Sequence, residues 1–459
     1  MYQINFNHPI HIYFIGIGGI SMSGLAELLL EKGFTVSGSD WNRSSLTERL
    51  EAKGAHINYG SQKAENITRD IDLTVYTAAV HADNPEYAET LRLGIPALTR
   101  AQLLGQIMKN YPLPIAISGI HGKTTTTSMV SEILLAADTD PTLSIGGILK
   151  SINGNMRIGK GQHFVTEACE YTNSFLSFFP KIGIILNVEE DHLDFFKDIH
   201  DIRNSFHEFA KLLPADGTLI INGDIPEISV ITKDITCSVI TYGDRASYDY
   251  SPCNITYNEK GCATFTLKSP GNRTDTFTLA VPGKHNVSNA MSAIALADLL
   301  FIDREVVKKA LAEFKGTDRR FEYKGTFRGI SIIDDYAHHP TEITATLTAA
   351  ANYPCNKLWC VFQPHTYTRT KAFLKEFAES LSLADEVILA KIYPARETDN
   401  LGISSETLQK EIEALGKKCH YFETFAEIEK FISSNCKEGD LLITMGAGDV
   451  VNIGENLLK

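Results

Sequence analysis

Short apolar runs, each followed by turn residues and then by helically spaced apolar positions, recur along the whole chain. The runs are rich in β-branched residues, which is typical of buried strands. We predict strands at residues 11–15, 34–37, 73–77, 115–117, 163–167, 182–186, 218–222, 239–242, 331–334, 358–362, 386–390 and 441–444. We predict helices at residues 21–32, 84–93, 124–135, 283–297 and 341–352. This alternation predicts an α/β protein with doubly wound parallel sheets.

Residues 264–281 depart from this pattern, because apolar and polar side chains alternate there on both sides of a turn at 270–274. Such alternation predicts an antiparallel strand pair. A length of 459 residues suggests about three domains. A proline-containing linker near residues 110–114 and a polar stretch at 315–322 divide the chain into 1–108, 109–314 and 315–459. We expect two Rossmann-like domains on either side of a central P-loop-type α/β domain that carries the antiparallel element.

A glycine-rich turn follows the buried strand at 115–117, in the sequence PIAISGIHGKTTTTS. Gly119 and Gly122 would let backbone N–H groups approach phosphate oxygens, and Lys123 would add a full positive charge. Thr124 would place its hydroxyl on Mg²⁺. The strict nucleotide-loop pattern has a glycine at position 117, where this chain has isoleucine, so an ordinary strand-to-helix turn with an exposed lysine stays open.

The strand at 11–15 leads into a second glycine turn, GIGGIS, which nearly satisfies the dinucleotide fingerprint G-x-G-x-x-G. Ser21 occupies the position of the third glycine. Asp40 lies where dinucleotide-binding folds place the acid that contacts ribose. This turn predicts a phosphate-containing ligand without identifying it.

Three further groups of polar residues follow predicted strands or open a helix. Glu167 and Glu170 come at the end of one strand and His192 after the next, where they could hold Mg²⁺, although a histidine after an acidic turn is as often a surface residue. His285, Asn286 and Asn289 lie on the first turns of a helix, so they could cap it or contact a purine. In the third domain, parallel strands would bring together Asp335, His338, His365 and Arg369.

Composition excludes some function classes. The formal net charge of −13 argues against a nucleic-acid-binding protein, because phosphate neutralisation needs clustered lysine and arginine. The start, MYQINFNHPI, does not resemble a secretory signal, and no apolar run is long enough to span a membrane. The eight cysteines form no C-x-x-C pair, which indicates scattered reduced thiols and a cytoplasmic protein.

Together the motifs resemble those of the Mur ligase family over essentially the whole chain and in the family's order. The matching segments are GIGGISMSGLAE, GIHGKTTTTS, EACE, NVEEDH, GKHNVSNA, RRFE, DDYAHHPTEI, FQPHTYTRT and TMGAGDV. Three positions differ from the usual family pattern: Ile120 replaces threonine, Cys169 replaces an acid, and Ser21 replaces glycine.

The resemblance implies a role for each matching residue. The ATP-binding residues would be Gly119, Ile120, His121, Gly122, Lys123, Thr124, Thr125, His285, Asn286, Asn289 and Arg320. Metal ions would be held by Thr124, by Glu167 with Glu170 as the alternate, and by His192. The UDP-sugar would contact Gly16, Gly18, Gly19, Ile20, Ser21, Ser39, Asp40 and Arg100. The catalytic residues would be Lys123, His192, Asp335, His338 and His339, with either His338 or His339 as the base.

The implied reaction is an ATP-dependent ligation. ATP would phosphorylate the lactyl carboxylate of UDP-N-acetylmuramate, and the amine of L-alanine would attack the acyl phosphate, giving ADP and phosphate in peptidoglycan precursor synthesis. The implied cofactors are ATP and Mg²⁺ or Mn²⁺, and the partners are small molecules, with a monomer or weak homodimer expected. A murein-recycling ligase that attaches a tripeptide, an NAD-dependent dehydrogenase and a catalytically silent nucleotide-binding protein are the alternatives.

Overall fold

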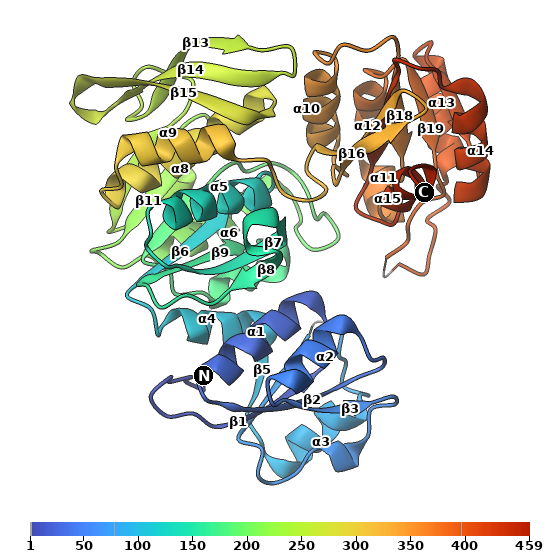
Figure 1. The fold of residues 1–459 in the computed structure, drawn as a ribbon. Helices are drawn as coiled ribbons and strands as arrows, with labels where there is room; N and C mark the ends of the chain where they lie inside the picture. The colour runs from blue at the N-terminus through green and yellow to red at the C-terminus, as the bar shows by residue number, and fades with distance from the viewer. Residues whose placement is uncertain (1, 78, 396) are drawn as a thin grey trace.

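The computed structural model describes residues 2–77, 79–395 and 397–459, which form three α/β bodies (Figure 1). The N-terminal body contains a five-stranded parallel sheet in the order β3-β2-β1-β4-β5. Its strands are β1 (His11–Ile15), β2 (Thr35–Asp40), β3 (His56–Tyr59), β4 (Leu73–Tyr76) and β5 (Ala97–Thr99). Its helices are α1 (Ile20–Glu31), α2 (Ser45–Ala52), α3 (Pro85–Leu93) and α4 (Arg100–Met108).

The central body is built on a seven-stranded sheet in the order β12-β11-β10-β6-β9-β7-β8, in which only the edge strand β8 is antiparallel among the described pairs. The strands are β6 (Leu113–Ser118), β7 (Thr142–Leu149), β8 (Gly154–Arg157), β9 (His163–Ala168), β10 (Ile182–Ile185), β11 (Thr218–Asn222) and β12 (Ser238–Tyr242). Its helices are α5 (Lys123–Ala136), α6 (Ile199–Lys211), α7 (Ile228–Thr232), α8 (Lys284–Leu299) and α9 (Arg304–Glu313). Residues 114–118 of β6 are buried and mostly apolar, as expected for a parallel strand covered on both faces.

A three-stranded antiparallel sheet lies over helices α8 and α9 at the top of the central body (Figure 1). It consists of β13 (Ser251–Tyr257), β14 (Cys262–Ser269) and β15 (Arg273–Pro282). The predicted pair corresponds to β14 and β15, whereas β13 was not predicted. Phe265 and Phe277 are fully buried on its inner face, so this sheet closes the central core.

The C-terminal body has a six-stranded sheet in the order β16-β17-β21-β18-β19-β20, with β16 as an antiparallel edge strand. The strands are β16 (Glu322–Phe327), β17 (Ile330–Asp335), β18 (Leu358–Phe362), β19 (Glu386–Leu389), β20 (Lys418–Tyr421) and β21 (Leu441–Met445). The helices are α10 (Pro340–Ala350), α11 (Tyr367–Ala372), α12 (Leu374–Leu381), α13 (Ser405–Ala414), α14 (Phe425–Asn435) and α15 (Val451–Leu457).

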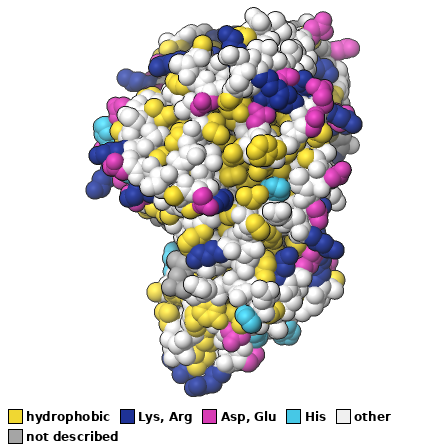
Figure 2. Space-filling view, turned by 90° about the vertical axis from the view of Figure 1, so that its left-hand side faces the viewer, with side chains coloured by type: hydrophobic (Ala, Val, Ile, Leu, Met, Phe, Trp, Pro, Cys, Tyr) yellow, Lys and Arg dark blue, Asp and Glu magenta, His cyan; other side chains and the backbone are white. Residues whose placement is uncertain are grey.

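The three-body α/β architecture and its parallel sheets confirm the predicted fold class. On the face that Figure 2 shows, basic and acidic side chains are interspersed around an apolar band. None of the helices in the described ranges has the length and apolarity that a membrane crossing requires.

Candidate active site

The glycine turn between β6 and α5 is held in a conformation that glycine permits. Gly119 and Gly122 have φ angles of +143° and +82°, which L side chains rarely adopt. A Cβ on Gly122 would lie 2.8 Å from Oδ1 of Asn289, so the turn also approaches helix α8 closely. The predicted phosphate-binding geometry, a strand, a tight turn and a helix N-terminus, is therefore present.

Lys123 points back into this turn. Its Nζ donates to the carbonyl oxygens of Gly119 and Ile120 and forms an ion pair of 2.8 Å with Glu170. Burial alone would lower the pKa of Lys123, but Glu170 outweighs that effect and raises it. Burial would raise the pKa of Glu170, and Lys123 and His192 lower it instead. Lys123 and Glu170 are therefore both charged.

A second carboxylate faces the first turn of α5. Oε2 of Glu167 accepts a hydrogen bond of 3.0 Å from the Thr124 hydroxyl, and Oε1 accepts the backbone N–H of Gly146. Gly146 fits because a Cβ there would lie 2.6 Å from the carboxylate. Burial raises the pKa of Glu167, although the Gly146 N–H and Arg320 oppose the rise.

His192 joins this group from the segment after β10. Its Nε2 lies 3.4 Å from Oε1 of Glu170, an oxygen that has no hydrogen-bond partner within the described chain. The neighbouring Asp191 accepts hydrogen bonds of 3.1 and 2.9 Å from Nε and Nη2 of Arg369 in the C-terminal body. Burial would raise the pKa of Asp191, and Arg369 lowers it overall.

A cavity of about 370 Å³ collects these groups from all three bodies. Ile20 reaches it from the N-terminal body. The central body contributes Ile120, Lys123, Thr124, Glu167, Glu170 and His192, and the C-terminal body contributes Arg320, Tyr336, His338 and Glu342. Residues that are far apart in the sequence therefore line one chamber.

A second cavity, of about 200 Å³, adjoins the same turn. Its lining includes His121, Gly122, Thr125, His285, Asn286, Asn289, Arg320 and Asp335. The N-cap of α8 is Gly283, which has no side chain to accept a capping bond, and neither asparagine occupies the N-cap position. Instead the Asn286 amide donates to the Pro282 carbonyl and the Asn289 amide donates to Asn286.

Asp335 and the two neighbouring arginines organise the entry to the C-terminal body. The Asp335 carboxylate accepts the backbone N–H groups of Phe321 and Ala337, and burial raises its pKa to about 6 while Arg320 opposes this. Arg319 is tied to the sheet, because its Nε donates to the buried Asp334 at 3.0 Å. Arg320 lines both cavities.

The two consecutive histidines face different spaces. His338 lines the Lys123 cavity, and its Nδ1 lies 3.0 Å from the Tyr336 carbonyl and 3.3 Å from Glu342. Burial lowers the pKa of His338 to about 3, so its imidazole is neutral. His339 instead is the N-cap of α10, where its Nδ1 accepts the Thr341 N–H, and it lines a separate surface cleft.

The predicted third-domain residues lie together but divide among adjoining cavities. The His338 and His365 rings are 5.8 Å apart, and Nη1 of Arg369 lies 3.4 Å from Nδ1 of His365. His365 and Arg369 line a cavity of about 190 Å³ with Asp191 and His192.

The glycine turn of the N-terminal body is also ordered by its neighbours. The Asp40 carboxylate accepts a hydrogen bond of 2.8 Å from the Gly18 N–H and so stabilises the turn. Ser39 is buried and donates to Glu86. Gly16 has a φ of +80°, whereas Gly19 and Ser21 continue into α1.

Arg100 begins α4, away from that turn in the sequence. Burial lowers the pKa of Arg100, and Cys169 beside the Lys123 cavity opposes this shift. Helix α4, which begins at Arg100, packs against residues Tyr171–Ser177 of the central body.

Two residues that organise the site were not among the predicted ones. Glu342 reaches His121 Nδ1 at 3.2 Å across the junction of the bodies, and His121 and His338 lower its pKa well below the usual value despite burial. The sequence could have indicated Glu342, because it lies in the first turn of the helix that begins at the HHP sequence. Asp191, which binds Arg369, lies in the acidic NVEEDH segment, from which only His192 was predicted as a site residue.

Comparison with known proteins identifies the family. Three family models match successive parts of the chain: "Mur ligase family, catalytic domain" at residues 11–112, "Mur ligase middle domain" at 117–297 and "Mur ligase, glutamate ligase domain" at 319–448. The UDP-N-acetylmuramate–L-alanine ligase of Lachnospira eligens is 61% identical over 460 residues, covering 100% of both chains.

Solved structures agree with this result. The UDP-N-acetylmuramate–alanine ligase MurC of Thermotoga maritima aligns with a TM-score of 0.80 at 30% identity, covering 98% of each chain. A murein peptide ligase of Psychrobacter arcticus aligns with a TM-score of 0.71 at 26% identity, also over 98% of each. The matched architecture, the phosphate turn and the full-length similarity together show that this chain belongs to the Mur ligase family.

Proposed function

We propose that this protein is an ATP-dependent ligase that joins L-alanine to the lactyl carboxylate of UDP-N-acetylmuramate during peptidoglycan precursor synthesis. The full-length similarity to ligases of that name supports the substrates. The observation that carries the chemistry is the single cavity in which Lys123, two carboxylates and residues of the C-terminal body meet. Neither an NAD-dependent dehydrogenase nor a silent binding protein accounts for that arrangement.

The first step activates a carboxylate, which is a poor electrophile. ATP transfers its γ-phosphoryl group to the lactyl carboxylate, giving an acyl phosphate and ADP. This transfer needs charge neutralisation and in-line positioning rather than covalent help. Lys123 and the backbone N–H groups of residues 119–125 would supply that neutralisation. The cavity lined by His285, Asn286 and Asn289 would take the adenine, with Arg320 and Asp335 at its edge.

The carboxylate set fits Mg²⁺, a hard cation that prefers oxygen ligands. Oε1 of Glu170 is buried without a hydrogen-bond partner within the described chain, and the Thr124 hydroxyl already faces Glu167. We infer that Thr124 and Glu167 hold one Mg²⁺ or Mn²⁺ and that Glu170 and His192 lie at a second. The bound metal would neutralise the charge on the transferring phosphoryl group.

The second step is attack by the amine of L-alanine on the acyl phosphate, which releases phosphate. The neutral amine loses one proton as the amide bond forms and the phosphate leaves, and the departing phosphate can take up that proton. His338 rather than His339 is placed to accept a hydrogen bond from the amine and orient it, because only His338 lines the cavity. Its Nδ1 faces the Tyr336 carbonyl and Glu342, which directs the lone pair of Nε2 away from them. Closure of the C-terminal body would exclude water that hydrolyses the intermediate.

The N-terminal body would hold the UDP-sugar. The turn formed by Gly16, Gly18, Gly19, Ile20 and Ser21 would bind the diphosphate, and Ile20 extends it to the reaction cavity. Asp40 and Ser39 would act by supporting the turn, and Arg100 would act closer to the lactyl end. We further propose domain boundaries at 108/109 and 314/315. We also propose a cytoplasmic location, which suits nucleotide substrates, and a monomer or weak homodimer.

Acceptor-dependent phosphate release tests this function. The full-length enzyme is given ATP, Mg²⁺ and UDP-N-acetylmuramate with L-alanine, glycine, L-serine, a stem tripeptide or no acceptor. We expect release with L-alanine, and its loss in Lys123→Ala. Release with the tripeptide alone would assign the protein to murein recycling, and no release with any acceptor would refute the ligase function.

A further inference from the structure

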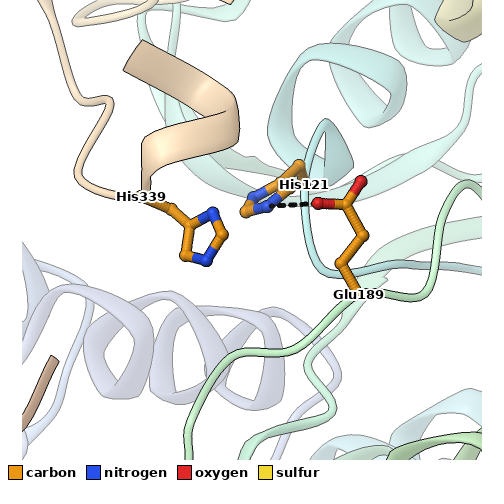
Figure 3. Close-up of side chains that lie close together, drawn as sticks. All are labelled: His121, Glu189 and His339. Atoms are coloured by element: carbon orange, nitrogen blue, oxygen red, sulfur yellow. Dashed lines mark ion pairs between the residues drawn. The ribbon is translucent and has the colours of Figure 1, made fainter. Parts of the chain in front are cut away.

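Two imidazoles and one carboxylate from three segments meet where the central and C-terminal bodies touch. His121 lies in the phosphate turn, Glu189 follows β10, and His339 precedes α10. One potential ligand atom from each side chain lies within 4.8 Å of the other two. Figure 3 shows the Glu189 side chain extending to the His121 ring and the His339 ring beside that ring. His121 Nε2 and Glu189 Oε2 are 3.8 Å apart.

Both imidazoles carry a buried Nε2 that makes no hydrogen bond in the described chain, although Nε2 of His121 lies within ion-pair distance of Glu189. Nε2 of His121 and Nε2 of His339 have no hydrogen-bond partner in residues 2–77, 79–395 and 397–459. His339 is only 5% exposed. Buried polar atoms without partners are rare in folded proteins because each one costs desolvation free energy. Two of them side by side with a carboxylate indicate that a ligand is accommodated there.

The surrounding hydrogen bonds hold His121 and Glu189 in place, and the contact of His121 with Glu342 resembles the outer contacts of metal-binding histidines. Nδ1 of His121 lies 3.2 Å from Oε1 of Glu342, so a proton on Nδ1 can be donated to that carboxylate, and a metal ion at Nε2 would replace any proton held there. Asn187 fixes the His121 backbone by bonding its N–H and its carbonyl at 2.8 and 2.9 Å. The Thr341 hydroxyl donates to Glu189 at 2.9 Å.

We propose that His121, Glu189 and His339 form a binding site for a borderline divalent transition-metal ion such as Zn²⁺. Two nitrogen donors and one carboxylate oxygen match the preference of Zn²⁺, whereas Mg²⁺ prefers oxygen donors alone. Tetrahedral Zn²⁺ with bonds of 2.0–2.1 Å places its ligand atoms about 3.4 Å apart, so binding draws these side chains slightly together. Coordination through Nε2 of His339 requires the ring proton to be on Nδ1, so it breaks the 3.3 Å bond in which Nδ1 accepts the Thr341 N–H.

This site differs from the carboxylate site beside Lys123 in both ligands and place. Glu189 and His339 do not line the Lys123 cavity, but both line a surface cleft with Thr341, which gives the ion a path from solvent. Because His121 and Glu189 belong to the central body and His339 to the C-terminal body, the bound ion links the two. It therefore favours the assembled arrangement of the bodies.

Co²⁺ serves as the probe, because tetrahedral Co²⁺ absorbs visible light. The full-length, metal-stripped protein is titrated with Co²⁺ without nucleotide, and Zn²⁺ is then added to displace it. We expect a saturable tetrahedral absorption band whose apparent Kd rises at least about tenfold in Glu189→Gln and in His339→Gln. Glu190→Gln, which removes the adjacent carboxylate, is the matched control and should bind as the unchanged protein does.

Glu170→Gln separates the two metal sites, because it alters only the carboxylate site and should keep the band. Circular dichroism melting verifies that each variant is folded, and Glu189→Gln keeps the test valid if His339→Gln destabilises α10. A Co²⁺ affinity unchanged in both Glu189→Gln and His339→Gln, or a band lost in Glu170→Gln and retained in Glu189→Gln, would overturn the proposal. The readout is metal binding, so its failure leaves the ligase function untouched.

Discussion

Replacing Arg369 by methionine should weaken the contact between the C-terminal and central bodies without unfolding the C-terminal body. Arg369 and Asp191 are 9% and 5% exposed at the side chain and pair across the junction of the two bodies. Removing one partner of a buried ion pair costs about 3–5 kcal/mol, because the other charge is left without compensation. That cost applies only while the bodies are assembled, since Asp191 can regain water when they separate.

The loss of this ion pair sets the expected drop in kcat/KM. If the whole cost falls on assembly, kcat/KM for L-alanine drops by roughly 10²- to 10⁴-fold at most, since 1.4 kcal/mol is a factor of ten. The thermal unfolding of the C-terminal body should change little, because its two apolar cores contain only residues from 321 onwards. Lys371→Met, which removes an exposed cation from the same helix, is the control and should be nearly neutral.

A double-mutant cycle with Asp191→Asn isolates the pair from other roles of Arg369. Phosphate release gives kcat/KM for the two single variants and the double variant, and the double variant should lose much less than the sum of the single losses. If the losses of the two single variants simply add in the double variant, the ion pair does not hold the two bodies together. The same conclusion would follow from a Tm that falls steeply in Arg369→Met while kcat/KM stays unchanged, because the pair would then stabilise folding rather than assembly.

Three further changes test separate parts of the site. Gly122→Ala forces an L residue to φ +82° with its Cβ 2.8 Å from Asn289, so ATP affinity measured by calorimetry should fall at least about tenfold, and unchanged affinity would contradict the turn geometry. Burial lowers the pKa of His285 to about 4, so the unfolded chain binds a proton that the native state excludes, and unfolding free energy falls from pH 6.5 to 4 by up to about 3 kcal/mol. His285→Asn should flatten that denaturation profile relative to the unchanged protein, and an identical slope would refute it. Thr124→Val removes the hydroxyl that faces Glu167, so the Mg²⁺ concentration for half-maximal rate should rise about tenfold, whereas an unaltered Mg²⁺ dependence would exclude the proposed ligand pair.

The sequence predicted well the elements in which local pattern and tertiary environment agree. Strand β18 matches the predicted range at both ends, because a run of apolar residues buried on both faces leaves little ambiguity. Strands β13 and β16 were missed, and both lie at sheet edges, where only one side needs apolar residues. The position at an edge is not decisive, because the edge strand β12 was predicted whereas the interior strand β7 (Thr142–Leu149) was also missed.

The candidate site divides in the same way. Lys123 and Thr124 were identified because both belong to one continuous sequence motif that follows a buried strand. The partners Asp191 and Arg369 are 178 positions apart, and their contact depends on how two bodies dock. The different fates of His338 and His339 likewise depend on the start of α10, which turns one ring into the cavity and makes the other a helix cap. Sequence periodicity does not contain that information.

The most direct test of the central claim follows an oxygen atom. UDP-N-acetylmuramate labelled with heavy oxygen in its lactyl carboxylate is incubated with ATP, Mg²⁺, L-alanine and the enzyme, and the released phosphate is analysed by mass spectrometry. Activation through an acyl phosphate predicts that one labelled oxygen moves into the phosphate for each amide formed. Phosphate that stays unlabelled while the amide accumulates would contradict the mechanism and the role assigned to the Lys123 cavity.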